Sequence, residues 1–133
     1  MRSRHVSRVV RADRDQVYAV VADPDHLPRW AQGLASAQVT RDGDDLVVES
    51  PMGPVRVRFV PRNPYGVADH DVTLPSGTTV TNPLRVLAHP DGSEVVFTVR
   101  QVELTDEEFE RDCRTVAADL ARLARLVEDR SRG

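Results

Sequence analysis

The chain has 133 residues and a mass of 14.8 kDa, which suits one domain with a single hydrophobic core. Its 18 basic and 21 acidic side chains give a formal charge of −3, so composition offers no electrostatic reason to expect nucleic acid or an anionic membrane as partner. The single cysteine, Cys113, excludes an intrachain disulfide, and Met1 to Arg11 lack the apolar run of a signal peptide or membrane span. We therefore expect one cytoplasmic domain over residues 1–133, with no membrane span.

The N-terminal segment predicts a strand followed by a helix. The β-branched run from His5 to Val10 suits a strand. Asp13 followed three residues later by Gln16 forms a capping box, which predicts a helix that ends near Ala22.

A second short helix is predicted where Asp23 precedes Pro24, because these residues suit an N-cap and a first helical position. It carries the chain to Trp30. From residue 34 to residue 101 the pattern changes to alternating strands, and we expect six antiparallel ones. The turn signals that separate them are Asp42 to Asp44, Pro51 to Pro54, Pro61 to Gly66, Pro75 to Gly77 and His89 to Gly92.

The C-terminal segment predicts one long amphipathic helix. Thr105 with Glu108 forms a second capping box, after which apolar residues recur at spacings of four and three over six turns. The residues of this stripe are Phe109, Cys113, Val116, Leu120, Leu123 and Val127. A sheet that curls round this helix would bury the apolar faces of both.

This order of elements resembles the helix-grip fold of the START-like (SRPBCC) superfamily, which includes polyketide cyclases and lipid-transfer domains. The most specific local similarity is Val17-Tyr18 followed by Asp23-Pro24 and by Leu27-Pro28-Arg29-Trp30. The resemblance implies an α+β fold with a curved, antiparallel, seven-stranded sheet wrapped around the long C-terminal helix. Two short helices would lie between strands 1 and 2, and a hollow would lie between sheet and long helix.

Strand alternation places His70 on the inward face of its strand. A three-residue turn at Pro75 to Gly77 would make Asn82 its direct cross-strand neighbour. Such a pair can satisfy its own hydrogen bonds in a filled core, or it can orient a small molecule in an apolar pocket. The resemblance favours ligand contact.

Further candidates for the cavity wall come from the neighbouring segments. Gln101 lies near a strand end, and Trp30 and Tyr65 lie where the resembled fold has its cavity mouth, so each of the two could shield a ligand or cap the core. The full set of cavity candidates is His70, Asn82, Gln101, Phe59, Phe97, Trp30, Tyr65 and Glu49.

The orientation of Glu49 depends on the turn at Pro51 to Pro54. A three-residue turn would place it opposite Val55 and inward, where desolvation would raise its pKa and suit it to general acid–base work. A two-residue turn would expose it. Met52, at the tip of this hairpin, could be a gate over the entrance or an exposed turn residue.

The carboxylates beside His70 point to the opposite face of the strand and cannot orient its ring. We expect them outside, with Asp69 opposite Arg58 and Asp71 opposite Arg56. Spacings typical of a metal site, a phosphate loop or a nucleophile elbow are missing, so we expect no metal and no cofactor.

Two functions follow from these features. One is binding of a small hydrophobic or aromatic molecule in the cavity. The other is a polyketide cyclase or dehydratase-like reaction, in which cavity residues position a substrate and His70 or Glu49 moves protons. Whether the chain is an enzyme, and its oligomeric state, stay open. A protein-interaction role is disfavoured because the outer sheet face is highly charged.

Overall fold

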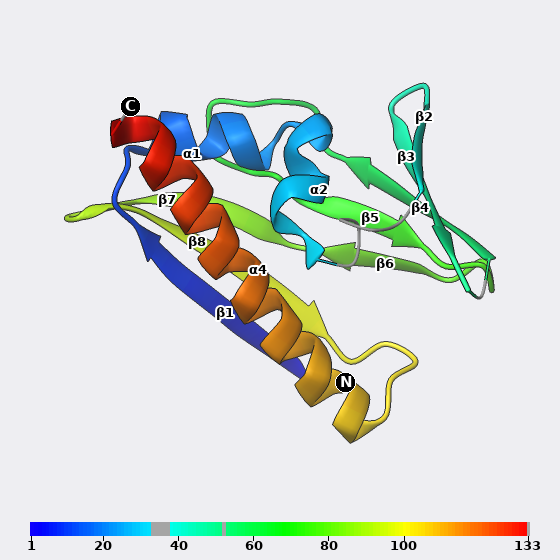
Figure 1. Cartoon of the computed structure of the whole chain (residues 1–133). Coiled ribbons are helices and arrows are strands. Elements are labelled where there is room, and N and C mark those ends of the chain that lie inside the picture. The colour runs from blue at the N-terminus through cyan, green and yellow to red at the C-terminus, as the bar shows by residue number, and fades with distance from the viewer. Residues whose placement is uncertain (33–37, 52, 133) are drawn as a thin grey trace.

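The computed structural model describes residues 1–32, 38–51 and 53–132, and shows strands covered on one side by helices (Figure 1). The expected start of the strand region at residue 34, and Met52, lie outside the described residues. The elements in chain order are β1 (Ser3–Val10), α1 (Arg14–Val21), the 3-10 helix η1 (Pro24–His26), α2 (Leu27–Trp30), β2 (Val39–Asp42), β3 (Asp45–Ser50), β4 (Gly53–Phe59), β5 (His70–Thr73), β6 (Thr79–Asn82), β7 (Leu84–His89), β8 (Gly92–Arg100) and α4 (Asp106–Arg132).

Both predicted capping boxes are confirmed. The Asp13 carboxylate accepts from the Gln16 backbone N at 2.8 Å, and the Gln16 side chain accepts from the Asp13 backbone N at 3.3 Å. Thr105 and Glu108 make the same reciprocal pair, at 3.2 and 2.9 Å, before α4. Each box satisfies two backbone N–H groups that a helix start leaves without intrahelical partners.

The second predicted helix is also present, as η1 followed by α2. Asp23 caps it by accepting from the Asp25 backbone N at 3.0 Å. At its other end, Arg122 of α4 donates from Nε to the Trp30 carbonyl at 3.2 Å. This bond satisfies one of the carbonyls left at the helix end and ties α2 to the long helix.

The strands form two sheets, of order β1-β8-β7 and β2-β3-β4-β5-β6, so the expectation of a single seven-stranded sheet was wrong. The strand expected between the turns at Pro75 to Gly77 and His89 to Gly92 is divided into β6 and β7 by Pro83. Proline has no N–H to donate to a ladder, which stops the pairing at that position. The Pro83 carbonyl still accepts from the Thr98 backbone N at 2.9 Å, and β6 therefore stays beside β8 although the two lie in different sheets.

The register of the β5–β6 hairpin is confirmed: His70 is opposite Asn82, and Val72 is opposite Val80. The expected register of β4 against β5 was wrong by two residues, because Phe59 lies opposite His70. A shift of two keeps every side chain on its face, since strand side chains alternate with a period of two. The predicted inward placement of His70 is therefore unaffected by this error in register.

The outer-face ion pairs differ from those expected. Asp69 pairs with Arg85, at 2.7 Å, while Asp71 accepts from the Thr81 hydroxyl. Both Arg58 and Arg56 reach the carboxylate of Asp45, at 2.5 and 3.1 Å. The β3–β4 register explains this difference, because it places Asp45 directly opposite Arg58. Arg56 also pairs with Asp42, at 2.8 Å.

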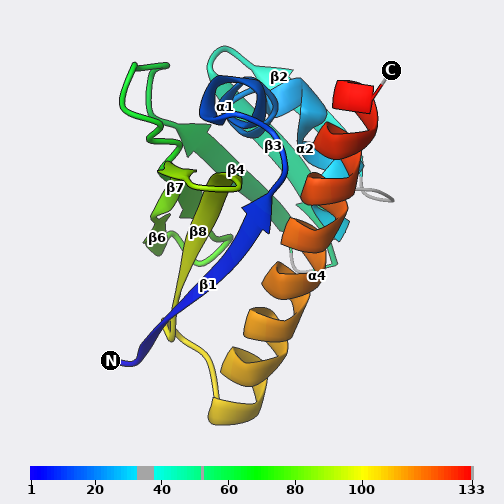
Figure 2. The same ribbon diagram turned by 90° about the vertical axis from the view of Figure 1, so that its left-hand side faces the viewer.

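The apolar stripe of α4 packs over the concave side of the strands, and α1 and α2 cover the sheet beside the C-terminal half of α4 (Figures 1 and 2). Buried stripe residues are Phe109, Cys113, Leu120, Leu123 and Val127. Burying an aliphatic or aromatic side chain of this size contributes about 1.5–3 kcal/mol. Val116, in the middle of the stripe, is only half-buried, because it faces unfilled space.

Within the described part of the chain, none of the helices combines the length and the apolar character that crossing a bilayer demands.

Candidate functional site

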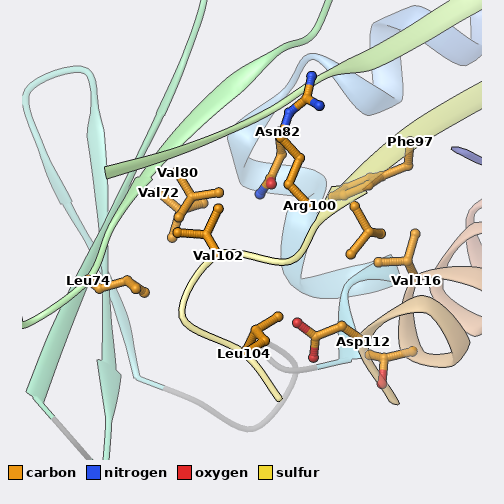
Figure 3. Close-up of a pocket in the computed structure, with 12 residues that line it drawn as sticks. Val72, Leu74, Val80, Asn82, Phe97, Arg100, Val102, Leu104, Asp112 and Val116 are labelled. Carbon is orange, nitrogen blue, oxygen red and sulfur yellow. The ribbon is translucent and has the colours of Figure 1, made fainter. Parts of the chain in front are cut away.

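The space that Val116 faces is a cavity between the strands and α4, divided into two compartments. The loop compartment, about 240 Å³, lies towards the β8–α4 loop (Figure 3). The α2 compartment, about 180 Å³, lies under α2. Val72, Phe97 and Val116 line both, and so form the boundary between them. The loop compartment is lined by Val72, Leu74, Val80, Asn82, Phe97, Val99, Arg100, Val102, Leu104, Asp112, Thr115 and Val116, and the α2 compartment by Leu27, Trp30, Ala31, Val57, His70, Val72, Phe97, Val116 and Asp119.

His70 is buried, with 8% of its surface exposed, and lines the α2 compartment. Its ring stacks on Phe59 with centroids 4.7 Å apart, and meets Phe97 edge-on at 5.6 Å. Nδ1 lies 3.2 Å from the Ala68 carbonyl oxygen. A carbonyl can only accept, so Nδ1 carries the proton in this contact.

The protonation of His70 follows from its surroundings. Burial lowers the pKa of His70 below its usual range, and the neighbouring Ala68 carbonyl and Asp69 only partly oppose this effect. The ring is therefore neutral at pH 7. With the proton on Nδ1, the other ring nitrogen, Nε2, is a hydrogen-bond acceptor and a potential base.

Asn82 lines the loop compartment and points into it (Figure 3). Although it is the cross-strand neighbour of His70, the two side chains do not bond to each other: His70 bonds to Ala68 instead. Among the residues that the structure describes, nothing hydrogen-bonds to the Asn82 carboxamide. A carboxamide without a partner, in a wall that is mainly apolar, can both donate and accept.

Two polar residues of α4 that the sequence analysis did not select face Asn82 across the loop compartment: Asp112 and Thr115. Asp112 precedes Val116 by four residues, one helical turn, and so flanks the apolar stripe. That spacing is the signal in the sequence that places Asp112 beside the stripe. Burial, and next Glu108, raise the pKa of Asp112 above its usual range.

Trp30 is buried at the α2 compartment, with 3% exposed. Its indole N–H is enclosed and finds no acceptor within the described residues. Asp119, the acidic residue of this compartment, accepts from the Gln32 backbone N at 3.0 Å and pairs with Arg122. Asp119 therefore serves mainly to hold α2 against α4.

Phe97 lies at the boundary of the compartments, whereas Phe59 lines neither and supports the His70 ring from one side. Gln101 is not at the cavity: its Nε2 donates to the Leu104 carbonyl at 3.1 Å and to Asp106 at 2.8 Å. These bonds close the loop that leads into α4. Tyr65 is also outside, on a loop, with 73% of its surface exposed.

Glu49 is exposed and lies opposite Pro54, which makes the inward orientation wrong. Ser50 pairs with Gly53, so two residues connect the strands where a three-residue turn was considered. A one-residue change in register moves a side chain to the other face of a strand. Glu49 is therefore no candidate for proton transfer in the cavity.

Metal-ligating side chains do not gather at this cavity: over residues 1–32, 38–51 and 53–132, no group of three or more His, Cys, Asp or Glu could hold a metal ion. The chemistry of the cavity therefore depends on apolar walls, a carboxamide, a hydroxyl group, a neutral imidazole and the charged side chains of Arg100, Asp112 and Asp119.

The family model described as polyketide cyclase / dehydrase and lipid transport matches residues 1–128 of the chain. The chain belongs to this family. The resemblance to SRPBCC proteins, drawn from the order of elements and the helix pair, is confirmed. No curated protein matches the chain.

Solved structures with the same fold cover nearly the whole chain. The protein XoxI from Bacillus cereus matches with a TM-score of 0.74 and 17% identity, over 98% of this chain and 99% of that one. An Aha1 protein from Colwellia psychrerythraea, whose dimer was solved, matches with a TM-score of 0.73 and 15% identity, over 96% and 97%. DynU16, a protein of the dynemicin biosynthetic locus, gives 0.71 and 16% over 95% of this chain but only 47% of its own. At these identities the likeness shows the fold alone.

Cyclases and lipid carriers both hold an organic molecule, so membership of this family suggests ligand binding. It names no ligand, and proteins of one fold can differ in reaction.

Proposed function

We propose that the chain binds a small hydrophobic or aromatic molecule in the cavity between the strands and α4. One observation carries the proposal: the Asn82 carboxamide, with no partner among the described residues, points into an unfilled cavity whose walls are otherwise mainly apolar (Figure 3). Ligand pockets combine these two features, because apolar walls supply binding energy and a few polar groups fix orientation.

In this proposal the ligand extends across the boundary formed by Val72, Phe97 and Val116. An apolar or aromatic part fills the α2 compartment, where His70 accepts a hydrogen bond at Nε2 from a ligand hydroxyl or N–H group. Asn82 orients the part of the molecule in the loop compartment. A ligand that spans both would have to displace the side chain of Phe97 or pass beside it.

A polyketide cyclase or dehydratase-like reaction is the second candidate function, and the state of His70 favours it. A neutral imidazole with a free Nε2, next to an apolar compartment, can take a proton from a confined substrate. Confinement would bring the reacting groups of a flexible chain together, and this alone can supply a large part of a rate enhancement.

The first test is native mass spectrometry of the protein purified from its own host, compared with the denatured protein. We expect an added mass that denaturation releases and that proves to be a mainly apolar compound. If the chain is a binding protein, the released compound returns unchanged after incubation with fresh protein. If it is an enzyme, the compound is a product, and a precursor is converted by the wild type and not by His70→Gln.

A blocking variant tests the location. Val116 lines both compartments, so Val116→Trp should fill the boundary and weaken binding of the neutral dye N-phenyl-1-naphthylamine at least about tenfold. Ala117 is its neighbour on α4 but is exposed and lines neither compartment, so Ala117→Trp is the matched control. Equal dye affinity in the two variants, with both folded, would place the binding site elsewhere.

A further inference from the structure

The wall of the loop compartment carries one acidic group, Asp112, which forms no ion pair within the described residues. Its carboxylate points into the compartment from α4, on the side opposite Asn82 (Figure 3). No hydrogen bond or ion pair joins Asp112 to another residue in the described part of the chain. By contrast Asp119, on the wall of the α2 compartment, is paired with Arg122.

The charged groups around Asp112 do not neutralise the negative charge of its carboxylate. Arg100 also lines the loop compartment, but its guanidinium points away from Asp112 and donates to the Ser3 hydroxyl at 2.9 Å (Figure 3). On α4, Arg111 favours the ionised form of Asp112 while Glu108 opposes it. The end of the loop compartment at α4, which Thr115 also lines, therefore presents a hydrogen-bond acceptor with negative charge.

We propose that Asp112 makes this cavity selective for apolar molecules that carry a hydrogen-bond donor, an amine or a hydroxyl, at the end next to α4. A carboxylate at the same end would face a like charge that no ion pair neutralises, so fatty-acid-like ligands are rejected. The inference rests on the proposed function, because it describes the ligand of the same cavity.

The direction and the size of the expected selectivity follow from hydrogen bonding and charge. An ammonium or hydroxyl group donates to a carboxylate, and hydrogen bonds with an ionised partner are roughly twice as strong as neutral ones. A carboxylate ligand can neither donate nor avoid the repulsion. Because Asp112 lies at the open rim of the compartment, water screens both effects, and we expect the amine to bind about tenfold more tightly than the acid.

The experiment uses three compounds that differ only in their polar end: 3-phenylpropan-1-amine, 3-phenylpropan-1-ol and 3-phenylpropanoate. Their dissociation constants are measured at pH 7.5 by titration of the full chain, with backbone and methyl NMR shifts as the readout. Shifts at Val116, Phe97 and Asn82 locate the bound compound in the cavity. We expect the amine to bind most tightly, the alcohol next and the carboxylate at least about tenfold more weakly than the amine.

Two variants assign the selectivity to Asp112. Asp112→Asn removes the charge at the compartment, and the three affinities should then agree within about threefold. Asp129→Asn makes the same change on the exposed surface of α4, 17 residues or about 25 Å along the helix, and lines neither compartment. This control should keep the selectivity of the wild type.

The outcomes separate the two proposals. If all three compounds bind with equal affinity and shift cavity residues, the selectivity proposal is overturned while the proposed function stands. The selectivity proposal is also overturned, and the proposed function again stands, if the carboxylate binds as tightly as the amine or if the selectivity persists in Asp112→Asn. If none of the compounds binds to the folded wild type, the proposed function fails, and the selectivity fails with it.

Discussion

His70 and Asn82 lie directly opposite each other on β5 and β6, yet they line different compartments of the cavity. His70 bonds to the Ala68 carbonyl within its own chain segment, and Asn82 turns to the space beside the β8–α4 loop. The two residues therefore do not satisfy each other, as they would in a filled core. Each keeps hydrogen-bonding capacity for a molecule that enters from outside.

His70 contributes to stability mainly as an aromatic ring, since it packs between Phe59 and Phe97. His70→Ala should lower the free energy of unfolding by about 2–4 kcal/mol, because it leaves a cavity in an aromatic cluster. His70→Phe keeps a ring of similar size, and its cost should stay within about 1.5 kcal/mol. Urea unfolding measures both. Equal losses in the two variants would show that the imidazole nitrogens, and not the packing, matter most.

The stability of the chain should depend on pH through His70. Burial lowers the pKa of His70 in the folded state below the value of about 6.5 in the unfolded chain. Between these values the unfolded state binds more protons, so the stability that is present above about pH 6.5 declines as the pH falls, by at most about 1.4 kcal/mol per pH unit.

The measurement is urea unfolding from pH 8 to pH 5 for the wild type and for His70→Phe, which cannot titrate at this position. The gap between the two proteins should narrow or change sign as the pH falls through this window. A constant gap would contradict a lowered pKa of His70. Nitrogen-15 shifts of the imidazole should in addition show the proton on Nδ1 at neutral pH.

Gly66 occupies a backbone position that no other residue fits well. Its φ is +74°, and a Cβ atom there would collide with the carbonyl oxygen of Val86, whose own N–H donates to the Gly66 carbonyl at 2.9 Å. Gly77 also has a positive φ, +92°, but a Cβ atom there meets open space.

Gly66→Ala should therefore destabilise the protein far more than Gly77→Ala. The control variant carries only the backbone strain of a left-handed conformation, about 1–2 kcal/mol. Gly66→Ala adds the displacement of a neighbouring backbone segment, and we expect a loss of at least about 3 kcal/mol. Thermal unfolding compares the two, and similar melting temperatures would refute the close approach of residues 66 and 86.

Glu110 joins α4 to β1 through Arg4, with two contacts of 2.6 and 2.8 Å, and also pairs at 3.1 Å with Arg2, which precedes β1. The bond to Arg4 lowers the pKa of Glu110 to about 2. The folded pKa lies below the unfolded value, so the stabilisation is present above about pH 4.5 and is lost as the pH falls towards 2.

Glu110→Gln should accordingly lower the melting temperature at pH 6, and its difference from the wild type should shrink between pH 4.5 and pH 2. Because these side chains are partly exposed, salt at 1 M should reduce the difference at pH 6 as well. Glu107→Gln, at an exposed position of the same helix, is the control and should have little effect at any pH. A difference that does not vary with pH would argue against the ion pair.

Local signals in the sequence were sufficient for one register and for the helices and most strands, but not for the separation of β6 from β7. The capping residues Asp13 and Thr105 determine where their helices begin, because they satisfy backbone groups a few residues away. The turn at residues 75–77 determines the pairing of His70 with Asn82 for the same reason, since both strands adjoin it.

Pairings across longer loops could not be read in the same way. Ten residues separate Phe59 from His70, and a loop of that length allows several registers with the same faces. Pro83 can be read in the sequence, but its effect on strand pairing cannot. That effect depends on which neighbouring strand would have accepted a hydrogen bond from the N–H group that proline lacks.

The sequence by itself determined the order of helices and strands, the apolar face of the long helix and the inward side of His70, because caps, turns and periodicity act over a few residues. Only the tertiary structure decided that a cavity remains, that it has two compartments, and that Asp112 points into one of them. Unfilled space is a property of how side chains from α4, α2 and the strands pack together, and no spacing within one segment contains that information.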